Sequence, residues 1–447
     1  MELAALIKRK LKTRYDASGN RHFKRSLLNA FPFWLGALIT GIVAVVYAKL
    51  FAFAEMGTAY LFHMAGWWFF VISPSCFMLS LWLVLKYAPF SRGSGIPQVS
   101  AALDLTTPKS YQLVERLLSI RIILIKIISS MVLALGGGVV GREGPTIQIG
   151  ASIFKKINDW LPEWYPKISK RNMIVTGAAA GLAAAFNTPL GGIVFTIEEL
   201  TKMHFSFFKS ALLTGVIIAG LTALTLLGPY LYLGYPVLDG ISPWILLIII
   251  PVAFITGIAS TEMCNLILYI NKKKMVLKKN YQKLIYAGIC GLIVALFAVL
   301  VDSRMFGSGK EIMVTTLFTN HKSMEWYMPI LRIIGPIVSF TSGGSGGVFA
   351  PALSTGASIG AVISGWFHLT DAATNLVILC GMTGFLTGVT RSPFTCSILV
   401  LEMTNTHNII FYILLASLCA NLISSFLSKH AFYEHLKVNF LREVEME

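Results

Sequence analysis

Charged residues are scarce in this sequence. Only 13% of its 447 residues are Asp, Glu, Lys or Arg, whereas soluble domains average about 25%. Hydrophobic residues make up 55% of the chain, and the mean hydropathy is +0.71. The deficit of charge excludes an ordinary water-soluble globule and indicates a polytopic membrane protein, with the lipid bilayer as a partner.

Acidic residues are the scarcer charges, with 21 Asp and Glu against 37 Lys and Arg and a net charge of +16. The basic residues cluster at the ends of apolar runs, for example in Lys8–Arg14, Lys167–Arg171 and Lys272–Lys283. Because no separate basic domain is present, the sequence argues against nucleic-acid binding, and the excess follows the positive-inside rule. The basic stretch before the first apolar run predicts a cytoplasmic N-terminal helix over residues 1–30, since that run lacks a small-residue cleavage site.

The sequence also lacks the usual motifs of catalysis and of metal or cofactor binding. Its six cysteines show no CxxC or metal-ligand spacing, and five lie within apolar runs, which indicates small packing residues. There is no HExxH motif, no Ser/His/Asp arrangement and no phosphate loop. We therefore expect no enzyme activity, no metal site and no cofactor. A membrane-embedded enzyme or a receptor-like scaffold is the alternative from another class.

Two halves of the chain carry the same features in the same order. The segment Gly150–Ile153 recurs 206 residues later as Gly356–Ile359, and a proline precedes each copy by the same distance. The other matched features are Gly93-Ser-Gly95 with Gly307-Ser-Gly309, Gly177 with Gly381, Pro189 with Pro393, and Glu198 with Glu402. The sequence therefore predicts a tandem duplication, with membrane repeats over residues 31–230 and 240–447, the second ending in a C-terminal helix.

Charges that flank equivalent apolar runs predict how the repeats are oriented. The run before the first Gly-Ser-Gly follows Glu55 and ends at Lys86, whereas the equivalent run Leu284–Val301 follows Lys272–Lys283 and precedes Asp302. By the positive-inside rule, these two runs cross the membrane in opposite directions. We predict an all-α fold of two inverted-topology repeats, whose tilted helices are broken by glycine-rich loops.

Glycines followed by a proline mark one helix start in each repeat, near Pro145 and near Pro351. In inverted repeats, these two starts approach the membrane midplane from opposite faces and point at a common spot. Each start offers unpaired N–H groups and about half a positive charge. Together they predict an anion site that needs no full cationic side chain.

Glu143 stands two residues before Pro145, and its equivalent in the second repeat is Phe349. A charged side chain at membrane depth costs about 2.5–3.5 kcal/mol on insertion scales, which makes Glu143 a functional candidate. When it is ionised, the carboxylate can occupy the anion site as a plug; when it is protonated, it can swing away. The alternative is a salt bridge with Arg142 or a simple helix cap.

Three other polar residues are weaker candidates. Ser94 lies in a glycine turn that feeds a proline helix start, where its hydroxyl either donates to an anion or belongs only to the turn. Glu198 and Glu199 follow the apolar run Met173–Ile197 directly. They are either functional carboxylates or simply the solvated end of that helix.

Four segments together resemble the chloride channel (CLC) family of anion channels and proton-coupled anion exchangers. They are GSGIP at Gly93–Pro97, GREGP at Gly141–Pro145, GGVFAP at Gly346–Pro351, and the segment Phe186–Glu199. The resemblance extends from about Phe31 to Leu441. It implies a homodimer with one anion pathway per subunit and two inverted halves, and it assigns gating and external proton transfer to Glu143.

In the family, a central anion is held by the serine hydroxyl of the first signature, by backbone N–H groups of the third, and by a tyrosine hydroxyl near the C-terminal helix. The resemblance assigns these roles to Ser94, to Val348 with Phe349, and to Tyr433. Tyr433 is favoured over Tyr412 because it lies beyond the last apolar run.

Exchangers of the family resemble this sequence in having an acidic residue at the position of Glu199, where it serves as the internal proton-transfer site. The resemblance therefore implies a secondary active chloride/proton antiporter, with a chloride-selective channel of the same fold as the alternative. Ser94 favours chloride over nitrate, and the intact signatures argue against the fluoride-exporting branch.

Two features set this chain apart from many relatives. Gln98-Val-Ser100 stands where acidic residues are common, and because Glu447 comes soon after the last span, we expect none of the CBS domains of many eukaryotic members. We expect chloride and protons as the transported ions, and a location in the inner membrane with both termini cytoplasmic.

Overall fold

The computed structural model describes residues 21–201, 209–228, 231–319 and 322–446 of the chain. These residues contain no β-strand, and only the isolated bridges Gly93–Ser345 and Gly141–Gly347 interrupt a set of helices and turns. The prediction of an all-α fold is confirmed. Of the N-terminal helix expected over residues 1–30, the first 20 residues lie outside the described part; from Arg21 the chain is helical and continues directly into the first span.

Each half of the chain contributes a matching series of helices. The helices of the first half are α2 (Arg21–Ala65), α3 (Phe69–Tyr87), α4 (Ile96–Asp104), α5 (Val114–Leu117), α6 (Ile120–Leu135), α7 (Glu143–Trp160), α8 (Lys170–Phe186), α9 (Pro189–Phe195) and α10 (Lys209–Leu227). Those of the second half are α11 (Leu246–Lys274), α12 (Asn280–Leu300), α13 (Lys310–Phe318), α14 (Met328–Ser342), α15 (Phe349–Trp366), α16 (Asp371–Thr390), α17 (Pro393–Thr404), α18 (Ile410–Leu427) and α19 (Phe432–Met446). Sequence spacing pairs the helices of the two halves in chain order: α3 with α12, α4 with α13, α6 with α14, α7 with α15, α8 with α16, α9 with α17 and α10 with α18.

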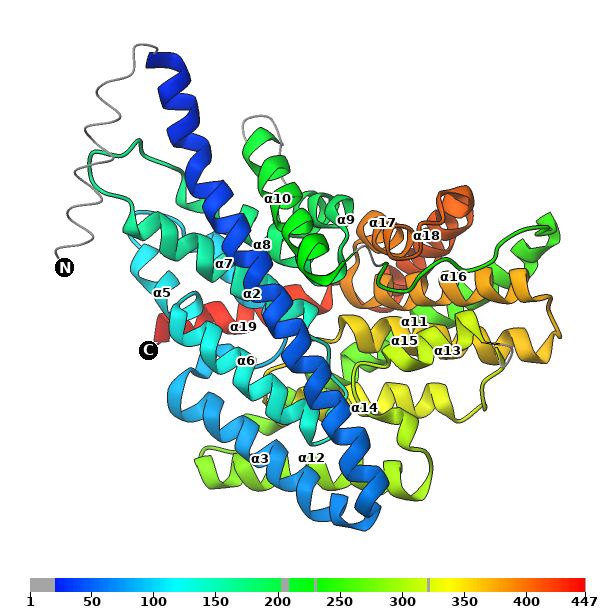
Figure 1. Ribbon diagram of the computed structural model, residues 1–447. Helices are drawn as coiled ribbons and strands as arrows, with labels where there is room; N and C mark the ends of the chain where they lie inside the picture. The colour runs from blue at the N-terminus through cyan, green and yellow to red at the C-terminus, as the bar shows by residue number, and fades with distance from the viewer. Residues whose placement is uncertain (1–20, 202–208, 229–230, 320–321, 447) are drawn as a thin grey trace.

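Seven helical segments of the described residues are long and apolar enough to cross a bilayer. Figure 1 shows α2 in blue, running diagonally across the first half, with most of the second half, in green to orange, on the right and the yellow-green α12 beside α3. The C-terminal helix α19, in red, returns to the first half and packs against α4. Ion pairs of 2.5 Å hold it there, between Arg92 and Glu443 and between Lys437 and Asp104.

Helices α3 and α12 show how the halves are related. Ser73 Oγ donates to the carbonyl of Gly291 at 3.0 Å, and a methyl group placed on Gly288 would lie 3.0 Å from Met78 Sδ. Residue numbers therefore rise along α3 as they fall along α12, and the two equivalent helices are packed antiparallel. Equivalent elements that run in opposite directions are expected of an inverted repeat, as the flanking charges predict.

Equivalent glycines in the two halves allow close backbone-to-backbone helix crossings. α7 crosses α8 where a methyl group on Gly150 would lie 2.2 Å from the carbonyl oxygen of Gly177. α15 crosses α16 where a methyl group on Gly356 would lie 2.2 Å from the carbonyl oxygen of Gly381. The backbones thus approach too closely for any side chain, as at other small-residue interfaces between membrane helices. The repeated glycine spacing in the sequence marks these two crossings.

Replacing Gly356 with Ala should separate α15 from α16 and lower the melting temperature of the protein in detergent. The new methyl group would meet backbone atoms, which cannot move aside as a flexible side chain can, so we expect a loss of about 1–3 kcal/mol. Gly66→Ala is the matched control, because its methyl group would lie 3.9 Å from its nearest neighbours. Equal melting temperatures for the two variants would contradict the explanation by close packing.

Candidate functional site

Three glycine-rich loops meet in the buried interior. Gly93 donates its N–H to the carbonyl of Gly344 at 2.8 Å and accepts from the N–H of Gly346 at 3.1 Å. Gly141 and Gly347 exchange both backbone hydrogen bonds, each of 2.8 Å. These bonds join the loops that precede α4, α7 and α15. Three helices therefore begin close together.

Ser94 lies against the first turn of α7. A methyl group placed on Gly144 would lie 2.2 Å from Ser94 Oγ, and the serine side chain is buried. The flanking Gly93 and Gly95 have φ angles of +62° and +108°, in the left-handed region that favours glycine. The Gly-Ser-Gly motif thus turns the chain so that the serine hydroxyl faces the positive end of a helix.

Glu143 is the first residue of α7, and its side chain is only 1% exposed. A methyl group placed on Gly141 would lie 2.2 Å from Glu143 Oε2 and 3.3 Å from the backbone nitrogen of Ala350. The carboxylate therefore lies back over Gly141, toward the first turn of α15. Oε2 has no hydrogen-bond partner among the described residues. The neighbouring Arg142 directs Nη2 to the carbonyl of Ala185, at 3.3 Å.

Tyr433 reaches this site from the far end of the chain. Its ring, on α19, stacks on that of Phe349 with centroids 6.4 Å apart and an angle of 20° between the planes. Its hydroxyl is buried close to that of Ser94, and neither hydroxyl has a partner in good hydrogen-bond geometry within the part of the chain that the structure describes. The structure thus brings Ser94, Val348, Phe349 and Tyr433 together with Glu143.

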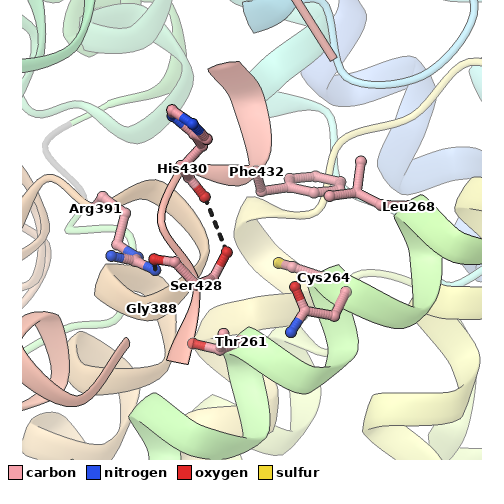
Figure 2. Close-up of a pocket in the computed structure, with 9 residues that line it drawn as sticks. Thr261, Cys264, Leu268, Gly388, Arg391, Ser428, His430 and Phe432 are labelled. Carbon is pink, nitrogen blue, oxygen red and sulfur yellow. Dashed lines mark hydrogen bonds between the residues drawn. The ribbon is translucent and has the colours of Figure 1, made fainter. Parts of the chain in front are cut away.

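A short linker between α18 and α19 leads into the helix that carries Tyr433, and Figure 2 shows the linker residues Ser428 and His430. Arg391, in a left-handed conformation at the end of α16, donates from Nη2 to the carbonyl of Ser428 at 3.0 Å. Ser428 Oγ donates to the carbonyl of His430 at 3.2 Å, which is the dashed line in Figure 2. These residues and Cys264 line a pocket of about 10 Å³, enough for about one water molecule. The linker is thus held by α16, close to the start of α19.

Glu199 occupies a separate position, in the π-helical turn η4 (Thr196–Thr201) after α9. Its Oε2 accepts from the hydroxyl of Ser392, the N-cap residue of α17, at 2.9 Å. The side chain is half-buried and lies near enough to Tyr433 for an electrostatic interaction. It is therefore held between the two halves and is not simply solvated. No group of three or more His, Cys, Asp or Glu that could hold a metal occurs among the described residues.

Comparison with known sequences identifies the family. The sequence model described as voltage gated chloride channel matches residues 76–425, most of the chain. The protein belongs to this family. Among its relatives are the H(+)/Cl(-) exchange transporters ClcA of Cronobacter sakazakii, 28% identical over 92% of this chain and 90% of that protein, and of Salmonella arizonae, 28% identical over 92% and 88%.

Solved structures of the family share the fold. A slow cyanobacterial Cl-/H+ antiporter superposes with a TM-score of 0.79 at 22% identity, covering 93% of this chain and 98% of that one. A CLC-type fluoride/proton antiporter gives 0.74 at 20% identity, with coverage of 93% and 98%. A eukaryotic CLC transporter gives 0.72 at 19% identity, with coverage of 92% and 74%. The predicted fold of two inverted repeats is thus confirmed.

A reciprocal pair of carboxylates links the halves of this family member. Glu198 accepts from the N–H of Thr395, in the first turn of α17, at 2.7 Å. Its equivalent Glu402 accepts from the N–H of Gly191, in the first turn of α9, also at 2.7 Å. Each carboxylate thus caps a helix of the opposite half. The sequence reveals the matched positions but not the capping, which depends on contacts between the halves.

Two fully buried cations, which the sequence analysis missed, occupy equivalent positions behind the Gly-Ser-Gly loops. Lys126 on α6 donates to Gln148 Oε1 on α7, and Arg332 on α14 donates to Ser354 Oγ on α15 at 2.5 Å. Each cation precedes its partner by 22 residues, and the two pairs are 206 residues apart. Neither cation forms a salt bridge within the described residues. The sequence signal for Lys126 was a lysine inside the otherwise uncharged apolar stretch Ile122–Leu135.

The second Gly-Ser-Gly loop, Gly307–Gly309, differs from the first in the charged side chains that contact it. Glu55, on α2, accepts from the N–H of Ser308 at 2.7 Å, and a methyl group on Gly307 would lie 2.6 Å from Glu55 Oε1. Arg332 donates to the carbonyl of Gly307 at 3.2 Å. A carboxylate and a guanidinium therefore hold the second loop, whereas the hydroxyl of Ser94 in the first has no partner among the described residues.

Replacing Glu402 with Gln should weaken the cap of α9 while keeping the shape of the side chain. A neutral amide accepts hydrogen bonds less strongly than a carboxylate and loses its attraction to the helix dipole, so we expect a stability loss of about 1 kcal/mol. Thermal unfolding in detergent measures this loss. Glu163→Gln, at an exposed side chain, is the control; equal stability of the two variants would contradict the capping role.

Proposed function

We propose that this protein is a secondary active antiporter that moves chloride against protons across a membrane. The observation that carries the proposal is the buried Glu143 carboxylate, whose Oε2 has no partner among the described residues where two helices begin. A negatively charged group at that point takes the place suited to an anion. The relatives whose names specify H(+)/Cl(-) exchange support the same activity.

Chloride binds between the start of α15 and two hydroxyl groups. The backbone N–H groups of Val348 and Phe349 come from the first turn of that helix, and Ser94 and Tyr433 supply the hydroxyls. Both hydroxyls are buried and have no partner in good hydrogen-bond geometry within the described residues, so each has a proton to donate and gains from a ligand. Neutral donors and helix dipoles hold the ion without preventing its release.

Glu143 competes with chloride and carries the proton at the external side. The ionised carboxylate is attracted to the helix starts and excludes chloride from its own position. A proton taken up from outside removes that attraction, so the side chain leaves and an anion takes its place. Because the same group binds the proton and yields to the anion, the two ions are exchanged.

Glu199 transfers protons between the cytoplasm and the interior. Its half-buried carboxylate, bonded to Ser392, has access to water and also to the protein interior near Tyr433. Water completes the route to Glu143, because the apolar segments around the two glutamates offer no obvious chain of titratable residues.

The working unit is a homodimer with one anion pathway per subunit, in the inner membrane with both termini cytoplasmic. The basic end of α11, Lys272–Lys274, and the basic start of α12 at Lys279 support this orientation by the positive-inside rule. Transport of chloride and protons in this way needs no cofactor and no enzymatic step.

A pH gradient at fixed chloride should shift the reversal potential of the protein in liposomes, because each turnover moves both ions. A reversal potential that depends on chloride alone would favour the alternative, a chloride-selective channel of the same fold. Glu143→Gln should leave a chloride flux that no longer responds to pH, since a neutral amide neither competes as an anion nor carries a proton.

Glu199→Gln should stop proton movement while chloride still passes. The amide keeps the size of the side chain and can still bond to Ser392, but it cannot take up a proton. Simultaneous recordings with a pH electrode and a chloride electrode measure both fluxes. Glu163→Gln, at an exposed site, should retain full coupling. Full coupling in Glu199→Gln would show that the internal proton-transfer role is wrong.

A further inference from the structure

A cavity of about 630 Å³ opens on the first half of the protein, away from the site described above. The end of α3, the short helix α5, the start of α6 and the last turns of α7 form its walls. In Figure 1, α5 and α6 lie on the side of the first half that faces away from α16 and α18. Ser94, Glu143 and Tyr433 do not line this cavity, so it is separate from the anion site.

The charge of the cavity is positive. Arg116, Arg121 and Lys156 line it, and Glu115 is the acidic side chain among the lining residues. Glu115 is already paired with Lys155, a buried lysine behind the wall. Arg121 and Lys156 form no salt bridge within the described residues. The three lining cations are therefore not neutralised by an acidic group in the cavity.

Helix α6 begins in the cavity wall and adds to this positive charge. Ser119 caps it by accepting from the N–H of Ile122 at 3.4 Å, and Ser119, Ile120 and Arg121 all line the cavity. The dipole of this 16-residue helix directs its positive end at the same space. Cations together with a helix start suit a phosphate group, which accepts several charge-assisted hydrogen bonds at once.

An exposed apolar column leads away from the cavity along α6. Ile120, Leu124 and Ile128 are 45%, 55% and 46% exposed, and their spacing of four residues places them on one face of the helix. Ile120 belongs both to the cavity wall and to this column, and the exposed ring of Tyr87 lines the cavity beside it. The combined surface matches a molecule with a charged head and a long apolar tail.

We propose that this cavity binds the phosphate headgroup of an anionic phospholipid, with one acyl chain lying along the column on α6. Arg121, Lys156 and the start of α6 bind the phosphate, and Arg116 contributes long-range attraction from the side, where it also donates to the carbonyl of Val444 at 3.1 Å. Basic pockets between membrane helices on the cytoplasmic side bind such headgroups. A soluble phosphate compound would share the charged contacts but would leave the apolar column uncovered.

The test compares lipid-dependent thermal stability of the full chain in detergent. Phosphatidylglycerol should raise the melting temperature, and phosphatidylcholine, which has no net charge, should not. The double variant Arg121→Gln/Lys156→Gln should need at least about tenfold more phosphatidylglycerol for the same shift, because two cations near the headgroup are lost. The control Lys272→Gln/Lys278→Gln removes two exposed positive charges from the second half and should respond like the wild type.

Three results would overturn the proposal. An equal response of the double variant and the wild type to phosphatidylglycerol would exclude this cavity as the site. A full response to inorganic phosphate alone would assign the cavity to a soluble phosphate ligand. Leu124→Asn should weaken the response to long-chain phosphatidylglycerol but not to the dihexanoyl form; an unchanged long-chain response would exclude the column on α6.

Discussion

The site depends on two reciprocal backbone hydrogen bonds between Gly141 and Gly347. They join the loop before α7 to the loop before α15, so that helices from opposite halves begin at the same place. Away from bulk water, the partial charges of these helix starts are poorly screened and add to one another. Glycine favours this approach, because a methyl group on Gly347 would lie only 3.2 Å from the backbone nitrogen of Gly144.

The surrounding protein holds this junction in place from both halves. The buried basic side chains of Lys126 and Arg332 bind the helices that carry the junction, through Gln148 and Ser354, and they lie behind the Gly-Ser-Gly loops. Burying a charge is costly unless it is hydrogen-bonded, and Arg332 meets that requirement with backbone carbonyls as well as Ser354. These hydrogen bonds tie α6 to α7 and α14 to α15 behind the junction.

Much of the fold could be predicted from the sequence, because the bilayer restricts spanning segments to apolar helices and because the glycine spacing recurs in both halves. Ser94 and Glu143 could also be proposed as site residues from the sequence, since each stands in a glycine turn before a helix start. The cap made by Glu402 and the buried position of Arg332 could not be predicted from the sequence, because both depend on neighbours distant in the sequence. Tyr433 lies in a segment with little pattern of its own, and a family resemblance, not spacing, pointed to it.

The carboxylate of Glu55 in the second Gly-Ser-Gly loop has a consequence for how the duplicated halves diverged. Two copies of one ancestral segment would be expected to offer two equivalent places for an ion. In the second copy, the N–H of Ser308 already donates to the carboxylate of Glu55, and Arg332 binds the adjoining carbonyl. The protein itself thus fills this place in the second copy, whereas the Ser94 hydroxyl of the first has no partner among the described residues. Under the proposed transport function, this asymmetry would leave one ion path in a chain of doubled architecture.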